Sequence, residues 1–97
     1  MIVERRTYKV KQFCEQATAD FVKETQKEFG YPHVQRIYMP ISGPLNVVYH
    51  EYEFKDWQER EKFWAAFYAL PQIPEWIEKW KELVESSGDV EFLRLVE

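Results

Sequence analysis

The sequence predicts an α+β fold in which one four-stranded antiparallel sheet is covered by helices on one face. Two strand-like segments with alternating side chains lie at the two ends of the 97-residue chain. Two more lie in the middle, joined by a turn, and both intervals between these strands and the terminal ones show helical spacing of apolar residues. The resulting order, β-α-β-β-α-α-β, is that of the ferredoxin-like fold, in which two split crossovers surround a central hairpin.

The first half of the chain predicts a strand, a helix and a second strand. Ile2–Val10 interleaves β-branched and aromatic residues with charged ones, as strands do. Residues 12–29 have helical spacing, and Gly30 stands where a C-terminal cap is expected. A second strand is predicted at Val34–Ile41. Its Pro40 indicates an edge of the sheet, because proline cannot donate to a ladder.

The third strand is predicted within "ISGPLNVVYHEYEF", residues 41–54, after a turn at "SGPL". Successive side chains of a strand point to opposite faces. One face therefore receives Val48, His50, Tyr52 and Phe54, and the other receives Val47, Tyr49, Glu51 and Glu53. Both faces of this strand carry aromatic or aliphatic side chains.

The second half predicts two helices and a last strand. Asp56 is a candidate N-cap, and Glu59 three residues later completes a capping box. The sequence "LPQIP" ends this helix, and another helical segment is predicted from about Glu75. The sequence "SSGD" at 86–89 is predicted to be a loop, and Val90–Val96 the last strand.

The composition indicates one domain, residues 1–97, with a large aromatic core built from four Trp, six Tyr and seven Phe. The net charge is −4 and opposite charges are interspersed, which is atypical of proteins that bind nucleic acid or an anionic membrane. No apolar run approaches the roughly 18 residues of a membrane span. A single cysteine, Cys14, is typical of a reducing compartment, so we expect a cytoplasmic protein.

Since helices can cover only one face of the sheet, we expect the chain to form a homodimer. Val48, Tyr52 and Phe54 would each forgo about 1.5–3 kcal/mol of burial free energy if they were left in water. The total stability of a domain is only about 5–15 kcal/mol. Packing two sheets face to face about a two-fold axis would cover these side chains. A monomer with exposed rings on its sheet is the alternative.

Several motifs together resemble those of the NIPSNAP family. They are "VERRTY" at 3–8, "ISGPLNVVYHEYEF" at 41–54 leading into "DWQERE", and "PEW" at 74–76. The resemblance covers nearly the whole chain and implies the dimeric α/β-barrel superfamily, in which the sheets of two ferredoxin-like subunits close into a barrel. That superfamily includes antibiotic-biosynthesis monooxygenases and haem-degrading enzymes, which use the barrel interior as a pocket.

The resemblance also implies polar pocket residues on the first and third strands, facing the barrel interior. The predicted ligand-binding residues are Glu4, Arg6, Tyr8, His50, Tyr52, Phe54, Arg60 and Trp76. In a functional interpretation, Arg6 or His50 orients a small, partly aromatic ligand or acts as an acid or base. In a structural interpretation, Glu4 pairs with Arg6 and His50 binds a neighbour only to satisfy buried polar groups. Arg60 either closes over the pocket or pairs with an acidic neighbour on its helix.

The sequence contains no specific catalytic motif, so catalytic residues are unknown and an enzymatic activity is undecided. Only His33 and His50 are available as histidines, without the spacing of a metal site, and no metal or cofactor is predicted. We expect a homodimer that binds a small apolar or aromatic ligand inside the barrel without a reaction of its own. One alternative is a monooxygenase of the antibiotic-biosynthesis type acting on an aromatic substrate. Another is a structural interaction protein whose barrel is packed shut.

Overall fold

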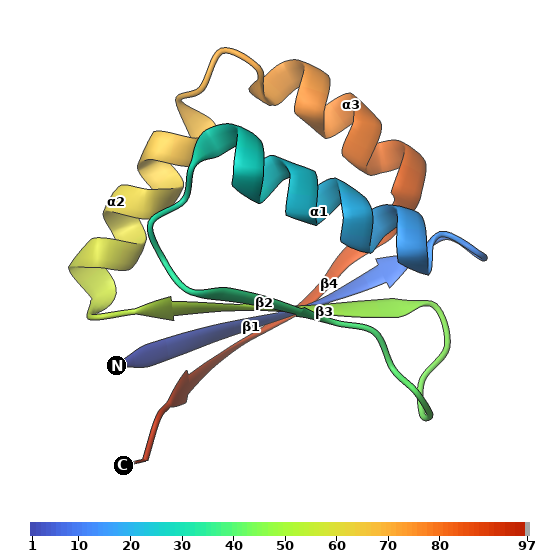
Figure 1. Cartoon of the computed structure of the whole chain (residues 1–97), viewed down its shortest axis with the longest axis horizontal. Coiled ribbons are helices and arrows are strands. Elements are labelled where there is room, and N and C mark those ends of the chain that lie inside the picture. The colour runs from blue at the N-terminus through green and yellow to red at the C-terminus, as the bar shows by residue number, and fades with distance from the viewer. Residues whose placement is uncertain (97) are drawn as a thin grey trace.

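The computed structural model describes residues 1–96. Its elements are β1 (Ile2–Val10), α1 (Glu15–Phe29), β2 (Gln35–Tyr38), β3 (Val47–Phe54), α2 (Trp57–Tyr68), α3 (Ile73–Leu83) and β4 (Val84–Arg94). The four strands form one antiparallel sheet in the order β2-β3-β1-β4. All three helices lie on the same side of the sheet, with α1 beside α3 and α2 at one end (Figure 1). The predicted α+β fold and the predicted order of elements are confirmed.

Two predicted helix caps are present. Gly30 ends α1 in the left-handed conformation with φ of 59°, and its N–H donates to the carbonyl of Gln26. Asp56 precedes α2, and its Oδ1 accepts a hydrogen bond from the backbone N–H of Glu59 at 2.9 Å. These local signals therefore set the C-terminal end of α1 and the N-terminal end of α2.

Other predicted boundaries were wrong by a few residues. Helix α1 begins at Glu15 rather than at residue 12, because Phe13 has a φ of 69° and Cys14 is the N-cap residue. Strand β2 is limited to Gln35–Tyr38 and stops before Pro40. Helix α3 begins at Ile73 instead of about Glu75, with a proline in its first turn, where the missing N–H costs nothing.

The sequence "SSGD" was predicted to be a loop. It is part of β4 instead. The pairing of β4 with β1 shifts its register between Thr7 and Lys9, so that the strand contains a bulge. Gly88 lies at this point with a φ of 63°, and a Cβ atom there would be 1.7 Å from the carbonyl oxygen of Thr7. Only glycine allows both this conformation and this close approach of the two backbones.

The helices cover the sheet face that the sequence prediction assigned to a partner. Val48, Tyr52 and Phe54 are only 0%, 5% and 1% exposed within the single chain. Val48 packs in a cluster with Val22 of α1, and Tyr52 and Phe54 pack against Phe63 of α2. The prediction that a second chain is needed to bury these three side chains was therefore wrong, since the chain's own helices bury them.

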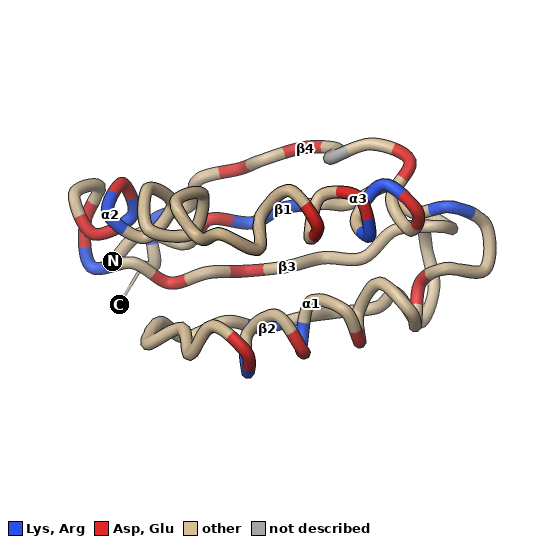
Figure 2. Tube along the Cα trace, turned by 90° about the horizontal axis from the view of Figure 1, so that it is seen from above, with Lys and Arg blue, Asp and Glu red and all other residues tan. Residues whose placement is uncertain are grey.

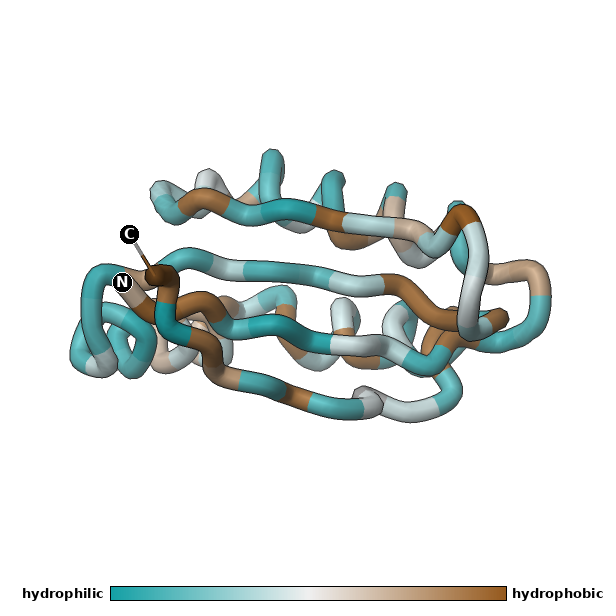
Figure 3. The backbone as a smooth tube through the Cα atoms, turned by 90° about the horizontal axis from the view of Figure 1, so that it is seen from below, coloured by the Kyte–Doolittle hydropathy of each residue, from teal (hydrophilic) through white to brown (hydrophobic). Residues whose placement is uncertain are grey.

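The helices leave the other face of the sheet uncovered, which Figure 3 shows from below. Ion pairs join neighbouring strands on this face. Arg5 on β1 lies 2.7 Å from Glu51 on β3, and Arg36 on β2 lies 2.7 Å from Glu53 on β3. Acidic and basic residues are spread over helices and strands (Figure 2). None of the helices in the described part of the chain is long and apolar enough to cross a membrane.

Candidate functional site

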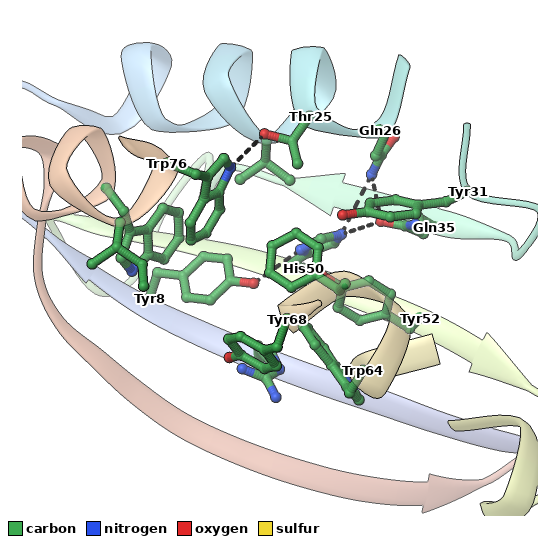
Figure 4. A pocket seen from close by; sticks show the side chains of 15 residues that line it. Tyr8, Thr25, Gln26, Tyr31, Gln35, His50, Tyr52, Trp64, Tyr68 and Trp76 are labelled. Atoms are coloured by element: carbon green, nitrogen blue, oxygen red, sulfur yellow. Dashed lines mark hydrogen bonds between the residues drawn. The ribbon is translucent and has the colours of Figure 1, made fainter. Parts of the chain in front are cut away.

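A cavity of about 180 Å³ lies between the helices and the sheet (Figure 4). Every helix and three of the four strands contribute side chains to its wall. The sheet supplies Arg6, Tyr8, His50, Tyr52 and Gln35; α1 supplies Val22, Thr25 and Gln26; α2 supplies Trp64, Phe67 and Tyr68; α3 supplies Trp76, Ile77 and Trp80; and Tyr31 comes from the loop before β2. Residues distant in sequence therefore meet around one partly enclosed space.

Aromatic rings form most of the cavity wall. The rings of His50 and Tyr52 are 4.1 Å apart between centroids, and Tyr52 meets Trp64 edge to face at 5.3 Å. On the opposite side, Trp76 and Trp80 are stacked at 5.1 Å, and Trp76 donates from its indole Nε1 to Thr25 Oγ1 at 2.9 Å. The Tyr52–Trp64 and Trp76–Trp80 geometries are those that aromatic pairs prefer, and they fix these rings around the cavity.

His50 lies at the centre of a hydrogen-bonded chain in the cavity floor. Its Nε2 is 2.9 Å from Gln35 Oε1, and its Nδ1 is 2.9 Å from the Tyr8 hydroxyl. A carbonyl oxygen can only accept, so we assign the proton of the neutral ring to Nε2, and Tyr8 then donates to Nδ1. Gln26 Nε2 also donates to Gln35 Oε1, at 2.9 Å. The chain links β1, β3, β2 and α1.

Burial keeps this chain of groups uncharged. His50 is 2% exposed, and burial together with the positive charge of Arg6 lowers its pKa to about 3. Burial likewise raises the pKa of the Tyr8 hydroxyl well above its usual value. At neutral pH the site therefore offers a neutral imidazole and a neutral phenol.

Two polar groups in the cavity wall have no hydrogen-bond partner among the described residues. They are the hydroxyl of Tyr31 and the side-chain Nε2 of Gln35, both shielded from solvent. In Figure 4 the Tyr31 hydroxyl points into the cavity, close to the Gln35 side chain. A buried polar group without a partner is costly, so these atoms are suited to hydrogen-bond a bound molecule.

A buried carboxylate adjoins the cavity. Glu4 is 0% exposed and accepts three hydrogen bonds. They come from Arg6 Nε at 2.6 Å, Arg60 Nε at 2.7 Å and Trp64 Nε1 at 3.3 Å. The Arg6 guanidinium carbon also lies 4.3 Å from the centroid of the Trp64 ring. Charge pairing and stacking together hold the Arg6 guanidinium in one position.

The cavity brings together some of the predicted ligand-binding residues and leaves others out. Its wall includes Arg6, Tyr8, His50, Tyr52 and Trp76. The remaining three lie behind it: Glu4 and Arg60 form the ion-pair cluster, and Phe54 packs with Tyr52 and Phe63. The resemblance implied that these side chains face the interior of a barrel. They lie instead on the face of β1 and β3 that the chain's own helices cover.

The structure shows the contacts of the structural interpretation, in which Glu4 pairs with Arg6 and His50 binds neighbours. Arg60 pairs with Glu4 and, at 3.3 Å, with the exposed Glu61. Cys14 is a free thiol that packs against the core cluster around Tyr8 and Val10. Within residues 1–96, no cluster of three or more His, Cys, Asp or Glu side chains is placed to hold a metal ion.

Sequence reasoning missed the cavity residues outside β1, β3 and "PEW". The stripe Thr18, Val22 and Thr25 on α1 carried a signal, since two hydroxyl residues lie at helical spacing with a core valine. Tyr31 and Gln35 carried none, because a loop residue and a four-residue strand have no measurable period. The placement of Gln35 follows from the β2–β3 register, which pairs it with Tyr52.

Comparisons with known proteins agree with this fold. The sequence model of the NIPSNAP family matches residues 3–97. An uncharacterized NIPSNAP domain protein from Burkholderia xenovorans is 24% identical, with a TM-score of 0.77 over 99% of this chain and 95% of that chain. A NIPSNAP-like domain protein from the same species is 22% identical, with a TM-score of 0.83 over 98% and 84%. A NIPSNAP family protein of unknown function from Agrobacterium tumefaciens is 26% identical, with a TM-score of 0.74 over 96% and 84%. No curated protein is significantly similar to the chain.

Proposed function

Since the chain belongs to the NIPSNAP family, we propose that it is a homodimeric binding protein that holds one small aromatic or apolar molecule without catalysing a reaction. Residues 1–97 would act as one domain. The observation that carries the ligand proposal is the cavity, which is mostly apolar with a few convergent polar groups, as ligand sites are. An engineered cavity of about 150 Å³ binds benzene. The 180 Å³ found here offers room for one ring with small substituents.

The ligand site of this proposal lies between the helices and the sheet of one subunit, rather than in the interior of a dimeric barrel. The open cavity favours a binding protein over a structural protein whose interior is packed shut. The state of His50 favours binding over acid–base catalysis, because a general base works best with a pKa near the working pH. Burial lowers the pKa of His50 to about 3, which makes it a weak base at neutral pH.

A test of the ligand proposal uses benzyl alcohol, a neutral single-ring compound, in calorimetric titrations. Ile77→Phe would add volume inside the cavity and is expected to abolish binding of this probe. Glu78→Phe places the same ring on the neighbouring, exposed position of α3 and should leave binding unchanged. Equal binding by both variants, or no binding of any single-ring compound by the natural protein, would refute the cavity as a ligand site.

The dimer is supported by apolar side chains that extend beyond the uncovered face of the sheet. The β2–β3 connection and the end of β4 both extend to the side away from the helices (Figure 1). In the connection, Ile41 and Leu45 are 105% and 85% exposed, and Leu95 after β4 is 47% exposed. Burial of each such side chain stabilises by about 1.5–3 kcal/mol. A second copy packed sheet to sheet about a two-fold axis would cover them.

Sedimentation at micromolar concentration tests the dimer. The natural chain is expected to sediment at twice its 11.9 kDa mass, and the double variant Ile41→Asp, Leu45→Asp as a monomer. Phe13→Asp is the matched control, because Phe13 is 86% exposed but belongs to the connection before α1 and not to the side chains assigned to the interface. A monomeric natural chain would contradict the proposal.

The free Cys14 agrees with a reducing compartment, and we propose the cytoplasm as the location.

A further inference from the structure

The guanidinium of Arg6 presents an unused set of donors to the cavity. Its Nε donates to Glu4 Oε2 at 2.6 Å, and the ring of Trp64 supports its flat face. Its two terminal nitrogens make no hydrogen bond to any residue within 1–96. A guanidinium has five N–H donors, so the four on the terminal nitrogens of Arg6 have no partner among the described residues. Because the group is held by its rear nitrogen and its face, its free edge is pre-organised for a planar acceptor.

The charge of the site is positive and has one source. Arg6 is the only charged side chain among the described residues of the cavity wall, because His50 and the tyrosines are neutral and none is acidic. Behind the wall, the single carboxylate of Glu4 is shared between Arg6 and Arg60. One negative charge for two positive ones leaves an excess positive charge, which favours an anion over a neutral group at this end of the cavity.

The opposite end of the cavity offers hydrogen bonds without charge. Arg6 lies on β1, while Gln35 lies on β2, and β3 runs between them. Strands two places apart in a sheet are separated by about 9–10 Å, and the rings of His50 and Tyr52 on β3 occupy the floor between them. The unpartnered atoms of Tyr31 and Gln35 are at the β2 side.

We propose that the ligand is a single-ring aromatic carboxylate with a hydroxyl group on the far side of its ring. The carboxylate binds the free edge of Arg6, the ring lies over His50 and Tyr52, and the hydroxyl meets Tyr31 and Gln35. This inference rests on the proposed binding function and adds the chemical class of the ligand. Charge-assisted, two-fold hydrogen bonds from arginine to carboxylate are among the strongest that proteins make.

Calorimetric titration at pH 7 with 4-hydroxybenzoate and 4-hydroxybenzamide tests the charge, since the two probes have nearly the same shape. The natural protein is expected to bind the carboxylate at least about tenfold more tightly than the amide. Arg6→Gln should reduce this preference to within about twofold, and Arg6→Lys, which keeps the charge but loses the fork, to an intermediate value. Arg5→Gln is the matched control: it removes the neighbouring guanidinium of β1, which pairs with Glu51 on the uncovered face of the sheet and does not line the cavity, and it should retain most of the preference.

The hydroxyl is tested with benzoate against 4-hydroxybenzoate. The natural protein should bind benzoate about three- to tenfold more weakly, and Tyr31→Phe should remove most of this difference. If Arg6→Gln does not fold, Arg6→Lys and the natural protein decide the question.

The outcomes separate this inference from the binding function itself. Equal affinities for the carboxylate and the amide would overturn the inference while leaving the binding function intact. A preference that persists in Arg6→Gln would overturn the role of Arg6. No binding of any of these probes or of benzyl alcohol would overturn both the inference and the binding function.

Discussion

Replacing Glu4 by glutamine tests the central electrostatic feature of the fold. The Glu4 carboxylate is fully buried and accepts from Arg6, Arg60 and Trp64. An amide of the same shape has one acceptor oxygen and one donor nitrogen. The nitrogen would face an arginine donor, so one guanidinium would lose its hydrogen bond and both would lose the opposing charge.

The size of the effect follows from the burial of the three groups. Breaking a buried ion pair by removing one partner costs about 3–5 kcal/mol. Arg6 and Arg60 are 19% and 22% exposed, so water can solvate them in part. We therefore expect Glu4→Gln to lower the free energy of unfolding by about 3 kcal/mol, at the low end of that range. For a domain of this size, this corresponds to a fall in Tm of about 12–24 °C.

Urea unfolding at pH 7, followed by tryptophan fluorescence, measures the change. Glu61→Gln is the matched control, because Glu61 also pairs with Arg60 but is 74% exposed. An exposed pair contributes about 0–1 kcal/mol, and the control should lose no more than that. A Glu4→Gln variant as stable as Glu61→Gln would refute the reasoning that the buried carboxylate holds the cluster together.

A double-mutant cycle separates the ion pair from other effects of the substitution. Arg60→Met is measured alone and in the Glu4→Gln background, and the two costs are compared. With an intact pair, Arg60→Met should cost at least about 1 kcal/mol more in the natural chain than in the Glu4→Gln chain. Equal costs would show that the contact between these residues contributes nothing to stability.

Three further predictions address other parts of the fold. Asp56→Ala should lower the free energy of unfolding by about 1 kcal/mol, because Asp56 caps α2 at Glu59 N–H, and Asp56→Ser should restore most of it in urea unfolding. Gly88→Ala should cost at least about 1 kcal/mol more than Gly30→Ala in the same assay. The two glycines share a φ near 60°, but only at Gly88 would the new Cβ meet another backbone, so equal costs would contradict this account. The stability of the natural chain should fall as the pH decreases from about 6.5, the unfolded pKa of histidine, because the unfolded chain takes up a proton that folded His50, with its pKa lowered to about 3, does not. The slope from this group is at most about 1.4 kcal/mol per pH unit, and it should be absent in His50→Gln; parallel pH profiles of the two proteins would contradict the neutral, buried state of His50.

Alternation in the strands made the composition of each sheet face predictable, but the assignment of the faces was wrong. The period of two places Val48, His50, Tyr52 and Phe54 together whatever lies above them. Periodicity does not say which of two apolar faces meets the helices. A further signal was available, because the opposite face of β3 carries Glu51 and Glu53, and their arginine partners lie on the neighbouring strands. Charged cross-strand pairs are typical of the face of a sheet that its own helices leave uncovered.

The candidate site was predictable where it lies on long, regular strands and hidden where it depends on register. Arg6, Tyr8, His50 and Tyr52 could be grouped because β1 and β3 are long and directly paired, with Arg6 opposite His50. Trp64 and Trp80 could not be recognised as cavity residues, since their helical spacing is equally typical of a core. Whether a buried aromatic ring contacts other rings or borders a cavity depends on how three helices cross the sheet, and a local sequence pattern does not contain that information.

The cavity itself is an argument for a ligand, because an unfilled space lowers stability. Residual cavity volume in a core costs about 24 cal/mol per Å³. The 180 Å³ found here therefore corresponds to at most about 4 kcal/mol, with water in the cavity reducing the loss. A domain has only about 5–15 kcal/mol in total. If the space served no purpose, a larger side chain at Ile77 would remove this cost with no loss to the protein. The ligand-free Ile77→Phe variant should consequently unfold at a higher urea concentration than the natural chain while losing its binding of aromatic compounds, which is the trade-off expected where a binding site is kept at the expense of stability.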